Sequence, residues 1–320
     1  MIVVPDDFPS VFAGSEALER AKKLDEVRVF SERGADDQDE LIRRLAGGTE
    51  AINIRAHARF TDRVFASCPG LKLVSIWGTG TDNFDLNAAG MRGVTICNTP
   101  GINAFAVAEH ALTLMLTVAR KVTLLDAEMR KGRWPREMLT QLLGKTLGVF
   151  GMGAIGSRVA TLGRGIGMNV LGWSAQGNEA RIRAAGARPA SKEEILRTAD
   201  VVSLHVRLTG ETRGFIGRKE LAVMKPTAIL VNTGRGALVE RDALLAALRD
   251  RRLLGAGLDV FHQEPIQPDD PLLTLPNVVC SPHNAGQTPE VIRDGLLTAV
   301  ENIENFRKGT PSNVVVAPVR

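Results

Sequence analysis

Cysteine is scarce in this sequence. The three cysteines, Cys68, Cys97 and Cys280, are widely separated and form no CxxC pair. A disulfide framework requires an even set of cysteines and a zinc knuckle requires closely spaced ones, so both kinds of site are disfavoured. We therefore expect buried free thiols in a reducing compartment, a cytoplasmic protein and no metal site.

Long apolar runs and an excess of charge of one sign are also missing. No uninterrupted apolar stretch approaches the ~18 residues that span a bilayer, and the apolar run at the N-terminus is too short for a signal peptide. The formal net charge is only +4, with basic and acidic residues interspersed. We therefore expect neither a membrane nor a nucleic acid as a partner.

Short β-rich runs alternate with helix-length segments through most of the chain. This alternation is typical of α/β proteins, in which helices cover both faces of a parallel sheet. The length of 320 residues favours two domains. We expect a small sheet in the first third, a larger sheet that begins near Thr146, a long buried helix at Asn103–Arg120 as the connector, and a helix at Glu290–Lys308 that returns to the first sheet.

The expected strands fall into two sets. The first sheet is expected to contain Ile2–Val4, Val27–Phe30, Ala51–Ile54, Leu73–Ile76 and Val94–Cys97. The second is expected to contain Thr146–Phe150, Asn169–Trp173, Val201–His205, Ala228–Asn232, Gly255–Val260 and Val278–Cys280. Helices are expected at Asp37–Ala46, Thr61–Ser67 and Glu240–Asp250.

A glycine-rich turn joins the strand at Thr146 to the helix that follows it. Gly151, Gly153 and Gly156 have the GxGxxG spacing, in the strand-turn-helix context that a Rossmann dinucleotide site requires. Gly151 would permit the tight turn, Gly153 the approach of a pyrophosphate, and Gly156 close helix packing. The chain is therefore predicted to bind a nicotinamide dinucleotide, whereas the later glycines of residues 163–167 precede a strand and are interpreted as a helix-to-strand turn.

The position that usually selects between NAD and NADP has no carboxylate here. An acid about 20 residues beyond the turn normally binds the ribose 2′-hydroxyl, but this chain has Ser174. NADP is therefore compatible with the sequence, with Arg181, Arg183 or Arg207 within possible reach of its 2′-phosphate. Equally, Ser174 could bind the ribose of NAD, so both cofactors stay open.

Three charged or titratable residues follow predicted strands of the second sheet. Arg235, Glu264 and His283 each come after an apolar run. The carboxyl ends of strands in an open α/β sheet face the ligand crevice, so these residues are candidates for chemistry.

With these residues in place, the chain resembles the D-isomer-specific 2-hydroxyacid dehydrogenase family. The matching segments are 78–85, 98–101, 107–112, 151–156, 231–236, 257–261, Glu264-Pro265 and 282–286. The resemblance implies a flavodoxin-like substrate domain at 1–99 and 288–320, and a larger Rossmann-like dinucleotide-binding domain at 100–287. It also implies a homodimer built on the cofactor domain.

The resemblance assigns roles residue by residue. It makes His283 the acid–base, assisted by Glu264, and Arg235 the cation that orients the carboxylate and carbonyl of a 2-oxo acid. Asp259 would contact the nicotinamide carboxamide, with a strand-terminal cap as the alternative. The cofactor contacts it implies are Gly151, Gly153, Ala154, Ile155, Gly156, Ser174, Val206, Thr233, Asp259 and Gly286.

Substrate contacts are implied for Arg55 and for the backbone amides of Gly78 and Thr79, although Arg55 could equally be a surface residue. Glu109 and His110 are expected to be packing or domain-contact residues rather than a metal pair.

The function that follows is the NAD(P)-dependent interconversion of a small 2-oxo acid, such as glyoxylate or hydroxypyruvate, and its D-2-hydroxy acid. A formate dehydrogenase is disfavoured because the family's formate enzymes carry Gln where this chain has Glu264. A dinucleotide-sensing corepressor is the alternative on the same fold. Arg207 and Asn284 depart from the family's usual residues, and both changes border the expected site.

Overall fold

The computed structural model describes residues 1–319 and divides the chain into two units. Unit 1 comprises Met1–Asn103 and the chain from Gln287 onward, and unit 2 comprises Ala104–Gly286. The observed boundaries lie within four residues of those expected. The long apolar helix α5 (Ala104–Ala119) belongs wholly to unit 2, so it is not the connector that the sequence predicted.

Unit 1 is built on a six-stranded sheet in the order β13-β5-β4-β3-β1-β2. Its strands are β1 (Ile2–Val4), β2 (Val27–Val29), β3 (Glu50–Asn53), β4 (Leu73–Ile76), β5 (Thr95–Cys97) and β13 (Val314–Val316). The first five are parallel in the order 2-1-3-4-5, which is the flavodoxin-like topology that was predicted. β13 pairs antiparallel with β5 and was not predicted.

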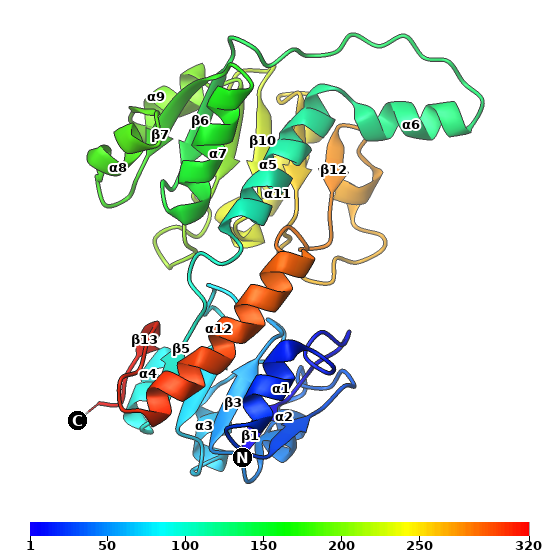
Figure 1. The fold of residues 1–320 in the computed structure, drawn as a ribbon. Coiled ribbons are helices and arrows are strands. Elements are labelled where there is room, and N and C mark those ends of the chain that lie inside the picture. Colours follow the sequence, from blue (N-terminus) through cyan, green and yellow to red (C-terminus); the bar gives the residue numbers. More distant parts are fainter. Residues whose placement is uncertain (320) are drawn as a thin grey trace. The chain divides into compact units, whose positions relative to one another are not determined.

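Helices cover both faces of this sheet (Figure 1). Apolar residues of α1 (Glu16–Lys22) and α12 (Pro289–Arg307) form one core cluster with the strands. α2 (Gln38–Leu45), α3 (Asp62–Ser67) and α4 (Leu86–Met91) contribute to the other. The buried Asn302 side chain donates to Ser75 Oγ and to the Asn98 carbonyl, which fixes α12 to the sheet as predicted for a returning helix.

Unit 2 contains a seven-stranded parallel sheet in the order β12-β11-β10-β9-β6-β7-β8. Its strands are β6 (Thr146–Phe150), β7 (Asn169–Trp173), β8 (Arg188–Pro189), β9 (Val201–Leu204), β10 (Ile229–Asn232), β11 (Gly255–Leu258) and β12 (Val278–Cys280). Counted from β6, the order is that of a Rossmann sheet with one added strand. This confirms the predicted fold class, and the predicted strand ends differ by at most two residues.

The two faces of the unit 2 sheet carry different helices (Figure 1). α5 and α7 (Ala154–Gly165) pack on one face, together with Ile182 of α8 (Glu179–Ala184). α9 (Lys192–Thr198), α10 (Arg218–Val223) and α11 (Arg241–Arg249) pack on the other. Cys68 and Cys97 are buried as expected, whereas Cys280 is exposed because β12 is the edge strand.

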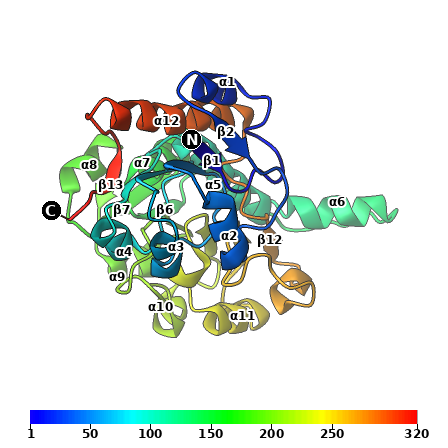
Figure 2. The same cartoon turned by 90° about the horizontal axis from the view of Figure 1, so that it is seen from below.

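One part of unit 2 projects away from its sheet, as both Figure 1 and Figure 2 show. Helix α6 (Val122–Arg130), which was not predicted, has no buried residue, and the chain from 131 to 145 contains no helix or strand. We call residues 122–143 the arm. Its exposed large apolar side chains are Val122, Met129, Trp134, Met138, Leu139 and Leu143.

In residues 1–319, no helix has both the length and the apolar character needed to cross a membrane.

Candidate active site

The glycine turn after β6 has the geometry that its motif predicts. Gly151 has φ +92°, and a Cβ at this position would lie 2.4 Å from the His205 carbonyl oxygen, so only glycine fits. A Cβ on Gly156 would lie 2.0 Å from the Gly151 carbonyl oxygen. Around Gly153, by contrast, a Cβ would meet nothing within 4 Å. The turn is therefore closely packed at Gly151 and Gly156 and open at Gly153, the residue that a pyrophosphate would approach. Ala154 and Ile155, which follow Gly153, form the N-terminus of α7.

The other predicted cofactor contacts of unit 2 lie at the same edge of its sheet. Because β7, β6, β9 and β10 are neighbouring parallel strands, the residues that follow them share one end of the sheet. Ser174 follows β7, Val206 lies just beyond β9, and Thr233 follows β10. Gly286 is the last residue of unit 2. The strand order reverses between β6 and β9, which is where open α/β sheets bind ligands.

His205 is a residue at this edge that sequence reasoning did not single out. Its Nε2 lies 2.8 Å from Ser203 Oγ, and its Nδ1 lies 3.5 Å from Thr233 Oγ1. Burial lowers the pKa of His205 to about 3, so its imidazole is neutral near pH 7. We assign it a structural role beside the glycine turn.

Two of the three predicted catalytic residues are in direct contact. His283 Nδ1 lies 2.6 Å from Glu264 Oε2, and the two side chains are 37% and 36% exposed. The other carboxylate oxygen of Glu264 accepts a hydrogen bond from the Phe261 amide at 2.9 Å. His283 has φ +52°, an uncommon conformation for a residue other than glycine, so the local structure must hold it there.

Glu264 is held in its ionised form. Burial by itself raises its pKa, but the hydrogen bond and charge of His283, the Phe261 amide and the positive charge of Arg235 outweigh this effect. The net result is a pKa of Glu264 below its ordinary value. The side chain therefore presents a carboxylate, not a carboxylic acid, to His283 at neutral pH.

Arg235 precedes the short 3-10 helix at Gly236–Leu238, just beyond β10. It is half-buried, and its Nη1 donates to the Gly234 carbonyl at 2.8 Å. The Asn232 side chain in turn donates to the Arg235 carbonyl at 2.9 Å, which fixes the backbone at this point. The positive charge of Arg235 helps to lower the pKa of Glu264.

Asp259 lies at the end of β11 and organises the loop that carries His283. Its side chain is fully buried and accepts hydrogen bonds from Ser281 Oγ at 2.6 Å, the Asn284 amide at 3.1 Å and the Ala285 amide at 3.0 Å. This geometry favours the capping alternative, because the donors come from the chain itself. A contact with the nicotinamide carboxamide stays a prediction.

The residues predicted to bind substrate, Arg55, Gly78 and Thr79, all belong to unit 1. Arg55 donates through Nη2 to the Pro9 carbonyl, and its buried Nε has no hydrogen-bond partner within residues 1–319. Desolvation lowers the pKa of Arg55. The Gly78 amide donates to Thr99 Oγ1 at 2.7 Å, so it is engaged within unit 1. A role for these residues in substrate binding stays a prediction.

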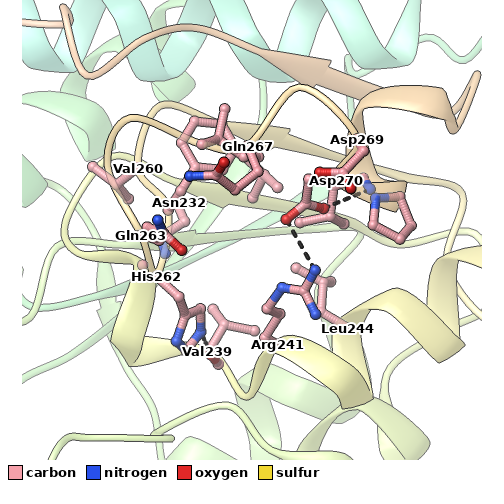
Figure 3. A pocket seen from close by; sticks show the side chains of 16 residues that line it. Asn232, Val239, Arg241, Leu244, Val260, His262, Gln263, Gln267, Asp269 and Asp270 are labelled. Carbon is pink, nitrogen blue, oxygen red and sulfur yellow. Dashed lines mark hydrogen bonds and ion pairs between the residues drawn. The ribbon is translucent and has the colours of Figure 1, made fainter.

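A cavity of about 390 Å³ lies on unit 2 (Figure 3). Gly236 and Gln263 line it, and they are the neighbours of Arg235 and Glu264 in sequence. Across it, Arg241 Nη2 pairs with Asp270 at 2.9 Å. Neither Arg235, Glu264 nor His283 lines this cavity, so we do not identify it with the reaction site. Within residues 1–319, no three His, Cys, Asp or Glu side chains cluster as metal ligands would.

Comparison with known proteins identifies the family to which this chain belongs. The family model for the NAD-binding domain of the D-isomer specific 2-hydroxyacid dehydrogenases matches residues 112–285. This chain belongs to that family.

Relatives match the chain over nearly its whole length. The glyoxylate reductase of Aeropyrum pernix is 39% identical over 310 residues, which cover 94% of this chain and 92% of the relative. A glyoxylate reductase structure from Paecilomyes thermophila is 29% identical, with a TM-score of 0.88 over 98% of this chain and 97% of that one. An acyclic imino acid reductase (Bsp5) in complex with NADPH and D-Arg is 28% identical, with a TM-score of 0.89 over 98% and 99%.

The chain is accordingly an NAD(P)-dependent D-2-hydroxyacid dehydrogenase that acts on a CH–OH group, and its cofactor is NAD or NADP. The recognition made from the sequence motifs is confirmed. The individual roles of the site residues are a separate matter and remain predictions.

The surroundings of Ser174 bear on which cofactor the enzyme prefers. Of the arginines considered, Arg183 pairs with Glu179 at 3.0 Å, and the Arg207 carbonyl accepts from Thr212 Oγ1 at 2.6 Å. Arg181 lies exposed on α8, and its guanidinium makes no hydrogen bond or ion pair within residues 1–319. No carboxylate comes directly after β7, which ends at Trp173, because the next acidic residue in the chain is Glu179.

We predict that Ser174→Asp shifts the enzyme toward NADH. A carboxylate at the end of β7 repels a 2′-phosphate and accepts from a ribose hydroxyl, so the kcat/KM ratio of NADH to NADPH should rise about tenfold or more. The control is Ala175→Asp, which adds the same charge one residue further on. An unchanged ratio in Ser174→Asp, or an equal shift in the control, contradicts the assignment.

Proposed function

We propose that this enzyme reduces small 2-oxo acids, with glyoxylate and hydroxypyruvate as the best candidates, to the corresponding D-2-hydroxy acids. The observation that carries the proposal is the 2.6 Å contact between His283 Nδ1 and Glu264 Oε2. A histidine in contact with an ionised carboxylate and near an arginine supplies the groups that reduction of a 2-oxo acid requires. The glyoxylate reductases among the relatives support the substrate class.

In this proposal His283 donates the proton to the carbonyl oxygen of the substrate. Its Nδ1 is engaged by Glu264, which leaves Nε2 as the nitrogen that can exchange a proton with a ligand. Glu264 orients the ring, and the Phe261 amide holds Glu264 in turn. General acid catalysis of this kind contributes about 10²–10⁴-fold to the rate.

Arg235 binds the carboxylate and polarises the carbonyl of the substrate in this proposal. Its guanidinium is permanently charged and presents a planar fork of donors, which suits a 2-oxo acid. The Gly234 carbonyl fixes Nη1. The charge that develops on the carbonyl oxygen during reduction makes the arginine more favourable in the transition state than in the ground state.

The open space at Gly153 and the N-terminus of α7 fit the pyrophosphate of the dinucleotide. When bound, the reduced nicotinamide would supply a hydride to the carbonyl carbon of the substrate. His283 would supply the proton to the carbonyl oxygen. The sign of the Glu264 pKa shift means that its carboxylate stays ionised down to a pH below its ordinary value of 4.5.

The test is a spectrophotometric panel of NADH and NADPH against glyoxylate, hydroxypyruvate, pyruvate and phosphohydroxypyruvate. We expect turnover with glyoxylate or hydroxypyruvate, and a loss of about 100-fold or more in kcat for His283→Ala, because the proton donor is removed. His262→Ala is the matched control, since the His262 side chain forms its hydrogen bond with the Val239 carbonyl and not with Glu264. Full activity in His283→Ala contradicts the proposed mechanism, and no turnover with any pair favours the dinucleotide-sensing corepressor.

We also propose that the enzyme is a cytoplasmic homodimer that pairs through unit 2. All three cysteines are free, as expected in a reducing compartment. The arm supports pairing, because Trp134 is 72% exposed and Met138 is 90% exposed although both are large and apolar. Contiguous exposed apolar residues mark interaction surfaces, and a second copy of this chain is the occupant that we propose for them.

We predict that the double variant Trp134→Ser/Met138→Ser dissociates the dimer, because it removes the apolar anchors of the arm. Light scattering coupled to size exclusion should give twice the 34.4 kDa chain mass for the wild type and a concentration-dependent decrease for the variant. Met91→Ser, which removes a methionine that is 73% exposed on α4, is the control and should remain dimeric. A monomeric wild type contradicts the proposal.

A further inference from the structure

A chain of three side chains runs behind the loop that carries His283. His110 lies on α5, Ser281 follows β12, and Asp259 follows β11, all within unit 2. His110 Nε2 is 2.7 Å from Ser281 Oγ, and Ser281 Oγ is 2.6 Å from Asp259 Oδ1. His110 Nε2 is itself 3.5 Å from the same carboxylate oxygen.

The direction of these hydrogen bonds follows from the number of protons. Ser281 has one hydroxyl proton, and at 2.6 Å from the carboxylate it must donate that proton to Asp259. The serine oxygen can then only accept from His110, which requires a proton on His110 Nε2. The network therefore fixes the role of His110 as a donor, and a side chain that merely fills space could not replace it.

The carboxylate at the end of this chain is the anchor of the His283 loop. Asp259 is fully buried, and its other donors, the Asn284 and Ala285 amides, lie directly after His283. The His283 amide donates to the Ser281 carbonyl at 3.1 Å, so the loop is bound on both sides of the histidine. A buried carboxylate that loses one donor is strongly destabilised, and its remaining partners shift to compensate.

We propose that His110 and Ser281 are positioning residues for His283. They complete the hydrogen bonding of Asp259 and thereby hold His283 at the φ of +52° from which it reaches Glu264. This inference rests on the proposed catalytic role of His283. It replaces the expectation that His110 is a packing residue, and it separates His110 from its neighbour Glu109, whose side chain is exposed.

The experiment compares His110→Leu, which keeps bulk but cannot donate, with His110→Gln, whose Nε2 can occupy the same donor position. Glu109→Gln is the matched control on the same helix. For each variant, kcat and KM are measured with glyoxylate and the preferred reduced cofactor, together with the cofactor Kd from nucleotide fluorescence. The deuterium isotope effect on kcat is measured with cofactor deuterated at the transferred position of C4.

We expect His110→Leu to lower kcat about 10- to 100-fold, the effect of losing one charge-assisted hydrogen bond behind a reacting group. The isotope effect on kcat should rise, because a misplaced proton donor slows the chemical step. The cofactor Kd should stay within about threefold, since the glycine turn is untouched. His110→Gln should retain kcat within about threefold, and Ser281→Ala should reproduce the loss even if His110→Leu fails to fold.

Wild-type kcat in both His110→Leu and Ser281→Ala overturns the proposal. An equal loss in His110→Gln and His110→Leu also overturns it, because the donor would then be irrelevant. A fall in kcat with an unchanged isotope effect indicates a smaller folded fraction and counts against positioning. Full activity in His283→Ala instead refutes the proposed function, so the two failures are distinguishable.

Discussion

The buried carboxylate of Asp259 is the interaction on which the candidate site depends. A charge removed from water is tolerated only when donors surround it, and here the donors are the Ser281 hydroxyl and the Asn284 and Ala285 amides. Each hydrogen bond to such a charged group is worth about 1.5–3 kcal/mol. These hydrogen bonds hold the loop next to His283, whose Nδ1 contacts Glu264.

The parallel sheet explains why these groups meet. β10, β11 and β12 are neighbours, so Arg235, Asp259 and Ser281, which follow them, emerge at one edge. The same edge carries the glycine turn between β6 and α7, where the close approach of the His205 backbone excludes any side chain on Gly151. The residues predicted for cofactor binding and for proton transfer therefore lie on one sheet, whose rigidity limits how far they can move apart.

Much of this arrangement was predictable from the sequence, because central strands are continuous apolar runs and the glycine turn has a defined context. The short elements were not. β8 has two residues, β13 lies at a sheet edge, and α6 buries no residue. None of them therefore shows the repeating pattern of apolar residues from which a strand or helix is predicted. The links from His110 to Ser281 and from Gly78 to Thr99 depend on which segments fold together, which no local pattern encodes. The hydrogen bonds from Ser281 and from the Asn284 and Ala285 amides to Asp259 likewise depend on tertiary structure.

The most direct test of this account is hydride transfer in a single turnover of Asp259→Asn. The amide has the shape of the carboxylate but loses its charge and one of its two acceptor oxygens, so one of the two loop amides loses its partner. If Asp259 organises the His283 loop, the rate of hydride transfer should fall about 100-fold while the cofactor Kd changes less than about threefold. A cofactor Kd weakened by a similar factor with an unchanged rate of hydride transfer would contradict the account and assign Asp259 to the nicotinamide.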